Sequence, residues 1–207
     1  ERINPRQGLM DKVQAFTQLG QFDKARESAG KLVQMNPHMA MSYVPLAWTY
    51  EAQKDLDGAI AVLDKGLAAE RDNPQVWVLR GQLCLKKGDQ TQALSCYDKA
   101  LTADTGYAPA YAAKAVAQQA HGNTGEAIKN YNLALEYDEH NALSLNNLAM
   151  LYADQEGKQA ECLKLAMTAY ENASSDPGVI DTLGYALLKN GRARETLRAL
   201  QKADTMW

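Results

Sequence analysis

A pattern of large and small side chains recurs every 34 residues along the chain, and it is clearest from residue 74 to residue 107. Numbered from Pro74, this stretch has glycine or alanine at positions 8, 20 and 27 and large side chains at positions 4 and 24. Two helices can approach closely only where side chains are short, and large side chains then fill the space that remains. The pattern therefore predicts a pair of packed helices. The residues concerned are Trp77, Gly81, Ala93, Tyr97 and Ala100.

The same pattern continues in register on both sides of this stretch. Shifting the frame by 34 residues places Tyr43 and Tyr111 at position 4, and Ala59 and Ala127 at position 20. One extra residue is needed near Gly157, in a turn between two helices. Because a weak pattern does not stay in register over nearly a whole chain by chance, the sequence predicts a single repeat array over residues 1–207. The predicted units are residues 6–39, 40–73, 74–107, 108–141, 142–176 and 177–207.

The spacing of these small and large residues resembles that of the tetratricopeptide repeat (TPR), a helix-turn-helix unit. The resemblance extends over residues 6–205. It implies an all-α fold, a right-handed α-solenoid of TPR helix-turn-helix repeats with about twelve helices. In such an array each unit buries its core against its neighbours, so one elongated domain is expected.

Pro45 is the residue that fits the repeat least well. It falls at position 6 of its unit, inside the expected first helix, where proline lacks a backbone donor and crowds the preceding turn. A helix that begins near Ser42 would tolerate it, because the first turn has spare N–H groups. Otherwise the sequence predicts a kink at this point.

The two ends of the chain suggest different boundaries. Residues 1–5 read like the end of an earlier repeat, so we expect the array to continue toward the N-terminus. Position 28 packs on the following unit and is apolar in earlier repeats, as at Leu67 and Leu101, but it is Asp204 in the last one. An unpaired charge buried there would cost several kcal/mol. The unit 177–207 is therefore predicted to be the C-terminal cap of the array.

The charge and composition of the chain exclude some classes of partner. The net charge is -3 and the isoelectric point is near 5.7, whereas a nucleic-acid-binding protein normally carries a basic face. Apolar residues make up 46% of the chain, but they form no run long enough for a transmembrane helix. The sequence predicts a folded protein that binds proteins or peptides, does not bind nucleic acid, and has no transmembrane helix in this segment.

The sequence contains no recognisable catalytic, metal-binding or cofactor-binding motif. His38, His121 and His140 are isolated in or beside turns, and the three cysteines lack the spacing of a metal site. Phosphate-binding loops and nucleophile motifs are absent. We therefore predict that this segment is not an enzyme, that it needs no cofactor, and that its cysteines are buried free thiols.

The C-terminal half has a narrower resemblance. Residues 146–152, 179–188 and 200–203 are similar to bacterial TPR lipoproteins and periplasmic TPR scaffold segments of exopolysaccharide export and exosortase (PEP-CTERM type) systems. That similarity implies a non-catalytic scaffold in the periplasm or at the cell envelope.

A TPR segment could have three other functions: a cochaperone-like clamp, a cytoplasmic adaptor or a docking arm of a larger enzyme. A cochaperone-like clamp for acidic chaperone tails needs cations on the first helices, but positions 2, 5, 6 and 9 of one unit carry Gln75, Val78, Leu79 and Gln82. The clamp is therefore disfavoured. A cytoplasmic adaptor and a docking arm of a larger enzyme are both compatible with a TPR segment.

Apolar residues on the first helices suggest the partner. In the TPR architecture, positions 2, 5, 9 and 12 of the first helix face the concave surface, and in this chain they carry few charges. Exposed apolar surface that runs through successive units usually marks an interaction site. The sequence therefore predicts a groove for an apolar or amphipathic segment, unless packing between units buries these side chains. The predicted groove residues are Met10, Met41, Val44, Trp48, Val78, Leu85, Val116, Met150 and Tyr185, with Leu143 and Leu188 beside them.

Overall fold

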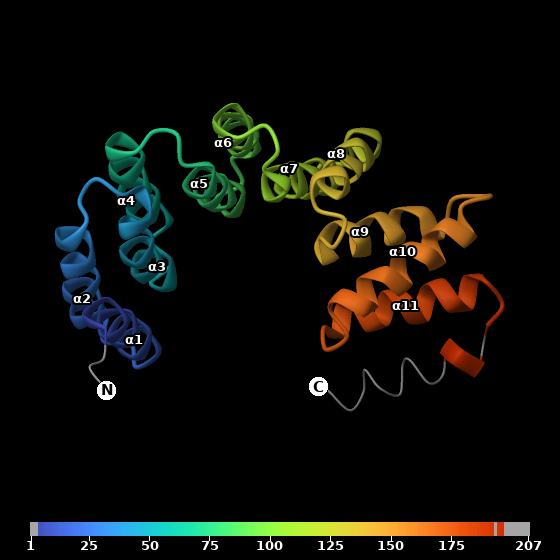
Figure 1. Cartoon of the computed structure of the whole chain (residues 1–207), viewed down its shortest axis with the longest axis horizontal. Helices are drawn as coiled ribbons and strands as arrows, with labels where there is room; N and C mark the ends of the chain where they lie inside the picture. Colours follow the sequence, from blue (N-terminus) through green and yellow to red (C-terminus); the bar gives the residue numbers. More distant parts are fainter. Residues whose placement is uncertain (1–3, 193, 197–207) are drawn as a thin grey trace. The chain divides into compact units, whose positions relative to one another are not determined.

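The computed structural model describes residues 4–192 and 194–196, and within these ranges the chain forms helices and turns but no strand (Figure 1). This confirms the all-α repeat fold. The helices are α1 (Pro5–Gln18), α2 (Phe22–Met35), the 3-10 helix η1 (Ala40–Tyr43), α3 (Val44–Ala52), α4 (Leu56–Ala69), α5 (Pro74–Lys86), α6 (Gln90–Ala103), α7 (Ala108–Ala120), α8 (Thr124–Tyr137), α9 (Ala142–Ala153), α10 (Gln159–Asn172) and α11 (Pro177–Lys189).

The chain divides into two compact units, the first ending at Thr105 and the second beginning at Gly106. In the first unit α1 packs on α2, α3 on α4 and α5 on α6, and in the second α7 packs on α8 and α9 on α10. Helices α5, α7, α9 and α11 begin at the first residues of four predicted repeats. The grouping of all six repeats into one array stays a prediction. Asp204 and the last part of the predicted cap, residues 197–207, lie outside the described residues.

Caps in the sequence explain where many helices begin. The side chains of Asp55, Asn73, Asp89, Asn141 and Asp176 each accept a hydrogen bond from a backbone N–H in the first turn of the helix that follows. These bonds satisfy donors that have no partner within the helix. At these five places the residue just before the helix therefore fixes where the helix begins.

Pro45 divides the first helix of its repeat rather than kinking it. The chain forms η1 up to Tyr43, and α3 then begins at Val44 with Pro45 in its first turn. Proline is tolerated there because the first-turn N–H groups have no intrahelical partner in any case. The prediction of a helix start near Ser42 was therefore correct to within about one turn.

The turn between the two helices of a repeat requires a left-handed backbone. Gly20, Gly88, Gly122 and Gly191 have φ between +69° and +83° at the same repeat position. Lys54 occupies that position in the second repeat and adopts φ +64°. A side chain in this conformation costs roughly 1–2 kcal/mol, so the turn geometry is set by the packing of α3 on α4 rather than by local preference.

Small residues at the repeat positions lie where helices touch, as predicted. Ala93 and Ala127 are fully buried, as are Ala100 and Ala134, which lie about two turns further along the same face of α6 and α8. A β-carbon placed on Gly81 would lie 2.5 Å from Cε1 of Tyr97, well inside contact distance. The α5–α6 pair is therefore close because position 8 lacks a side chain.

Two equivalent buried tyrosines differ in their hydrogen bonding. Tyr131 donates its hydroxyl hydrogen to Oε1 of Gln119 (2.8 Å) and accepts from Nδ2 of Asn147 (3.0 Å). Tyr97 is equally buried, but its hydroxyl has no partner among the described residues. Leu85 and Gln119 occupy the same position of their repeats, so the repeat of Tyr97 lacks the acceptor that Tyr131 uses. Burial raises the pKa of both phenols.

This difference predicts that replacing each tyrosine by phenylalanine will change stability differently in the two repeats. Tyr131→Phe removes the hydrogen-bond partner of two half-buried side chains, Gln119 and Asn147, and should lower the free energy of unfolding by about 1–3 kcal/mol. Tyr97→Phe removes an unpaired hydroxyl and should leave the free energy of unfolding unchanged or raise it slightly. Urea unfolding monitored by circular dichroism measures both, and similar losses in the two variants would contradict the expectation.

Candidate interaction surfaces

The predicted groove residues differ widely in exposure. Trp48 on α3 and Met150 on α9 are 47% and 44% exposed, and they are the most accessible of the set. The others that retain some exposure are half-buried, and all of them except Leu85 pack against a core cluster of their unit; these are Met10, Met41, Leu85, Val116 and Tyr185.

Two of the predicted groove residues are in the core. Val44 and Val78 are only 2% and 5% exposed, so the prediction that they offer surface to a partner is wrong. Val44 packs in the same core cluster as Leu63 and Val76. It begins α3 instead of lying within a longer helix, because η1 takes up the preceding residues. Position 5 therefore faces neighbouring helices in these two repeats.

Trp48 lies in a shallow groove between α3 and α5. Leu79 and Gln82 of α5 line the opposite side, and Leu63 of α4 forms part of the base. The charged residues at the rim, Glu51 and Lys86, form an ion pair with each other. This Trp48 groove, lined by Val44, Ala47, Trp48, Glu51, Leu63, Leu79, Gln82, Leu83 and Lys86, is thus apolar with a neutralised rim.

In the second unit, exposed apolar residues at the predicted groove positions lie on α9 and α11. Leu143 and Leu188 are exposed together with Met150, and all three occupy first-helix positions that were predicted to face the groove. Tyr185 is less available, because its hydroxyl donates to Asp154 Oδ1 (2.8 Å) and Lys189 covers its ring at 5.1 Å. A partner that bound here would contact Leu143, Met150 and Leu188 first.

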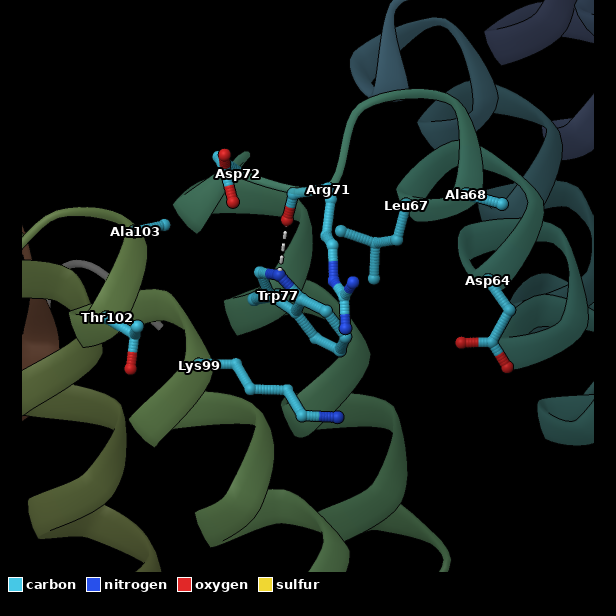
Figure 2. Close-up of a pocket in the computed structure, with 9 residues that line it drawn as sticks. All are labelled: Asp64, Leu67, Ala68, Arg71, Asp72, Trp77, Lys99, Thr102 and Ala103. Atoms are coloured by element: carbon cyan, nitrogen blue, oxygen red, sulfur yellow. Dashed lines mark hydrogen bonds between the residues drawn. The ribbon is translucent and has the colours of Figure 1, made fainter.

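A second depression surrounds Trp77, on the side of the first unit formed by α4 and α6 (Figure 2). The indole N–H donates to the carbonyl of Arg71 (2.8 Å), which fixes the ring. The Lys99 Nζ lies 4.6 Å from the ring centroid. Sequence reasoning missed this site because it assigned Trp77 to packing alone. The Trp77 pocket is lined by Asp64, Leu67, Ala68, Arg71, Asp72, Trp77, Lys99, Thr102 and Ala103.

Family models of the tetratricopeptide repeat match residues 16–83, 74–107 and 108–141, which together make up more than half of the chain. The chain belongs to the tetratricopeptide repeat family. The matched ranges include every residue that lines the Trp48 groove and the Trp77 pocket, so both surfaces are built from TPR units. TPR units are protein-interaction modules, and the helical pairs described above are their structural elements.

The curated relatives resemble only part of this TPR chain and are much longer. Lipopolysaccharide assembly protein B of Escherichia coli K12 is 27% identical over 101 residues, which are 46% of this chain and 26% of that protein. The BBSome complex member BBS4 of Bos taurus is 26% identical over 153 residues, or 73% of this chain and 29% of that protein. The chain therefore spans less than a third of the length of either relative.

Solved TPR structures share the fold at low sequence identity. PilF of Pseudomonas aeruginosa is 14% identical with a TM-score of 0.76, and the match covers 98% of this chain and 92% of that one. PilW, described as a type IV pilus biogenesis factor, is 15% identical with a TM-score of 0.70, covering 97% and 92%. YrrB, a TPR protein with an unusual peptide-binding site, is 20% identical with a TM-score of 0.58, covering 88% and 93%.

In the described part of the chain, no group of three or more histidine, cysteine, aspartate or glutamate side chains could hold a metal ion. None of the helices described combines the length and the hydrophobicity that a membrane span requires. Cys84, Cys96 and Cys162 are buried and free, and burial raises the pKa of the Cys84 and Cys162 thiols. A thiol with a raised pKa is a weak nucleophile at neutral pH.

Proposed function

We propose that this TPR chain is a non-catalytic scaffold that binds an apolar or amphipathic segment of a protein partner on its first-helix surface. The observation that carries the proposal is the Trp48 groove. Trp48 of α3 is 47% exposed and borders the groove between α3 and α5. The two charged residues at the rim, Glu51 and Lys86, already form an ion pair with each other. Tryptophan is enriched among residues that dominate binding energy. A neutralised rim favours apolar contact over charge recognition.

We propose further that the scaffold works in assembly at a bacterial cell envelope, in the periplasm or associated with a membrane. The support is the partial likeness to lipopolysaccharide assembly protein B and the shared fold of PilF and PilW. The sequence similarity of the C-terminal half to TPR segments of exopolysaccharide export and exosortase systems suggests a system of that kind.

Removal of the Trp48 indole should weaken partner binding without unfolding the protein. A library of displayed peptides is selected on the wild-type protein, and the enriched peptides are titrated by calorimetry. Trp48→Ala should weaken them by more than about 1 kcal/mol, or roughly fivefold, if the ring is an anchor. The enriched peptides should be rich in apolar residues, and their affinity should depend weakly on salt.

Leu19→Ala is the matched control, because Leu19 is an exposed apolar residue in the turn after α1 and lies outside the groove. It should leave the affinity unchanged. Equal affinity of the selected peptides for wild type and Trp48→Ala would exclude the Trp48 groove as their site. A steep loss of affinity with salt would place recognition on a charged surface.

A further inference from the structure

The Trp77 pocket exists because one repeat position is small. Ala103 ends α6 and occupies position 30 of its repeat, and it lines the pocket beside Thr102. In the next repeat the same position is Tyr137, at the end of α8, and its ring stacks on Tyr111 with centroids 5.6 Å apart. Tyr111 and Trp77 both occupy position 4. The space that an aromatic ring fills in one repeat is therefore open in the other.

Two cations without an ion-pair partner face this space. In Figure 2 the side chains of Arg71 and Lys99 both extend toward the Trp77 ring. Neither forms an ion pair with any residue in the described ranges, although Lys99 lies over the ring. Both residues are exposed, so their charged groups are accessible to a partner.

The acidic residues of the pocket do not neutralise these cations. Asp64 is held by Arg80, whose Nε donates to Asp64 Oδ1 (2.6 Å), and this bond is the main reason why the pKa of Arg80 is raised. Asp72 is exposed, and in the described ranges it forms no ion pair with Arg71 or Lys99. The uncompensated charge next to the ring is therefore positive, even though the whole chain is acidic.

We propose that the Trp77 pocket binds an acidic segment of a protein partner, with a glutamate or aspartate side chain between Arg71 and Lys99 and an apolar neighbour against Trp77 and Leu67. Both cations can donate charge-assisted hydrogen bonds to a carboxylate, and the fixed indole offers an apolar face. The site lies on the α4–α6 side and shares no lining residue with the Trp48 groove. It thus provides a second, charge-selective surface on the same unit.

The test follows the Trp77 indole N–H resonance by NMR in the full chain, assigned with Trp77→Phe. The probe is a hexapeptide of alternating glutamate and leucine with both ends blocked, so that it has no terminal carboxylate. The glutamate peptide should shift this resonance, and the matched glutamine peptide should not. Arg71→Gln and Lys99→Gln should each weaken binding of the glutamate peptide about three- to tenfold, and added salt should weaken it further.

Two further variants separate the pocket from general charge effects. Ala103→Tyr introduces the residue that fills the equivalent space in the next repeat, and it should abolish the shift. Lys65→Gln removes an exposed cation at the repeat position equivalent to Lys99 in the preceding repeat, and it should change nothing. Loss of binding in Lys65→Gln equal to that in Lys99→Gln would overturn the proposal. So would unchanged binding in Ala103→Tyr with its helical content intact, an absent response to the glutamate peptide, or an equal response to inorganic phosphate.

Discussion

Gly81→Ala is expected to destabilise the protein by about 1–3 kcal/mol, because the added methyl group overpacks the contact between α5 and α6. A β-carbon at this position would lie 2.5 Å and 2.9 Å from two ring carbons of Tyr97 and 3.1 Å from the carbonyl oxygen of Ala93. Tyr97 is fully buried, so its ring cannot swing into solvent. The helices must separate or the ring must leave its rotamer, and either response costs free energy.

Gly30→Ala is the matched control for this change. Gly30 also lies within a helix, α2, but a β-carbon there would meet no atom within 4 Å. The substitution should raise the free energy of unfolding by roughly 0.5–1 kcal/mol, because alanine restricts the unfolded chain and favours helix. Urea unfolding of both variants decides the matter. A loss of stability in Gly30→Ala comparable to that in Gly81→Ala would show that close packing at Gly81 is not the cause.

A double variant tests the contact itself. If the methyl group acts on the Tyr97 ring, Gly81→Ala should cost less in a Tyr97→Leu background than in the wild type, because the smaller side chain leaves room for it. The two residues touch, so their effects should not add. Additive losses would mean that the strain lies in the backbone near Ala93 and not in the ring.

Sequence reasoning predicted the helix pairs well because their determinants are local. Small residues such as Gly81 and Ala93, and caps such as Asp89, act within one repeat and recur at fixed spacing. The close approach of α5 and α6 follows directly from them. Lys54 shows the limit of this reasoning, since packing imposes on it a left-handed turn that its side chain does not favour.

The surfaces were harder to predict because exposure depends on how successive helices pack. The same first-helix face that leaves Trp48 accessible buries Val44, since the start of α3 is displaced by η1. The pocket at Trp77 had a signal in the sequence, the change from Tyr137 to Ala103 at one repeat position. The alanine indicates a pocket only because the structure shows that the Tyr137 ring fills the equivalent space in the next repeat.

Ala127→Leu is expected to destabilise the second unit by about 1–3 kcal/mol, again through overpacking. Ala127 is fully buried in a core cluster with Tyr131, Leu148 and Cys162, so three additional heavy atoms have no free volume to enter. Repeat proteins are stabilised mainly by contacts between nearest neighbours, so the loss should be regional. Hydrogen exchange should show reduced amide protection in α7, α8 and α9 and little change in α1 and α2.

Ala160→Leu, at an exposed alanine of α10, is the control and should change stability by less than about 0.5 kcal/mol. Uniform loss of protection through both units would instead mean that the chain unfolds as one cooperative structure.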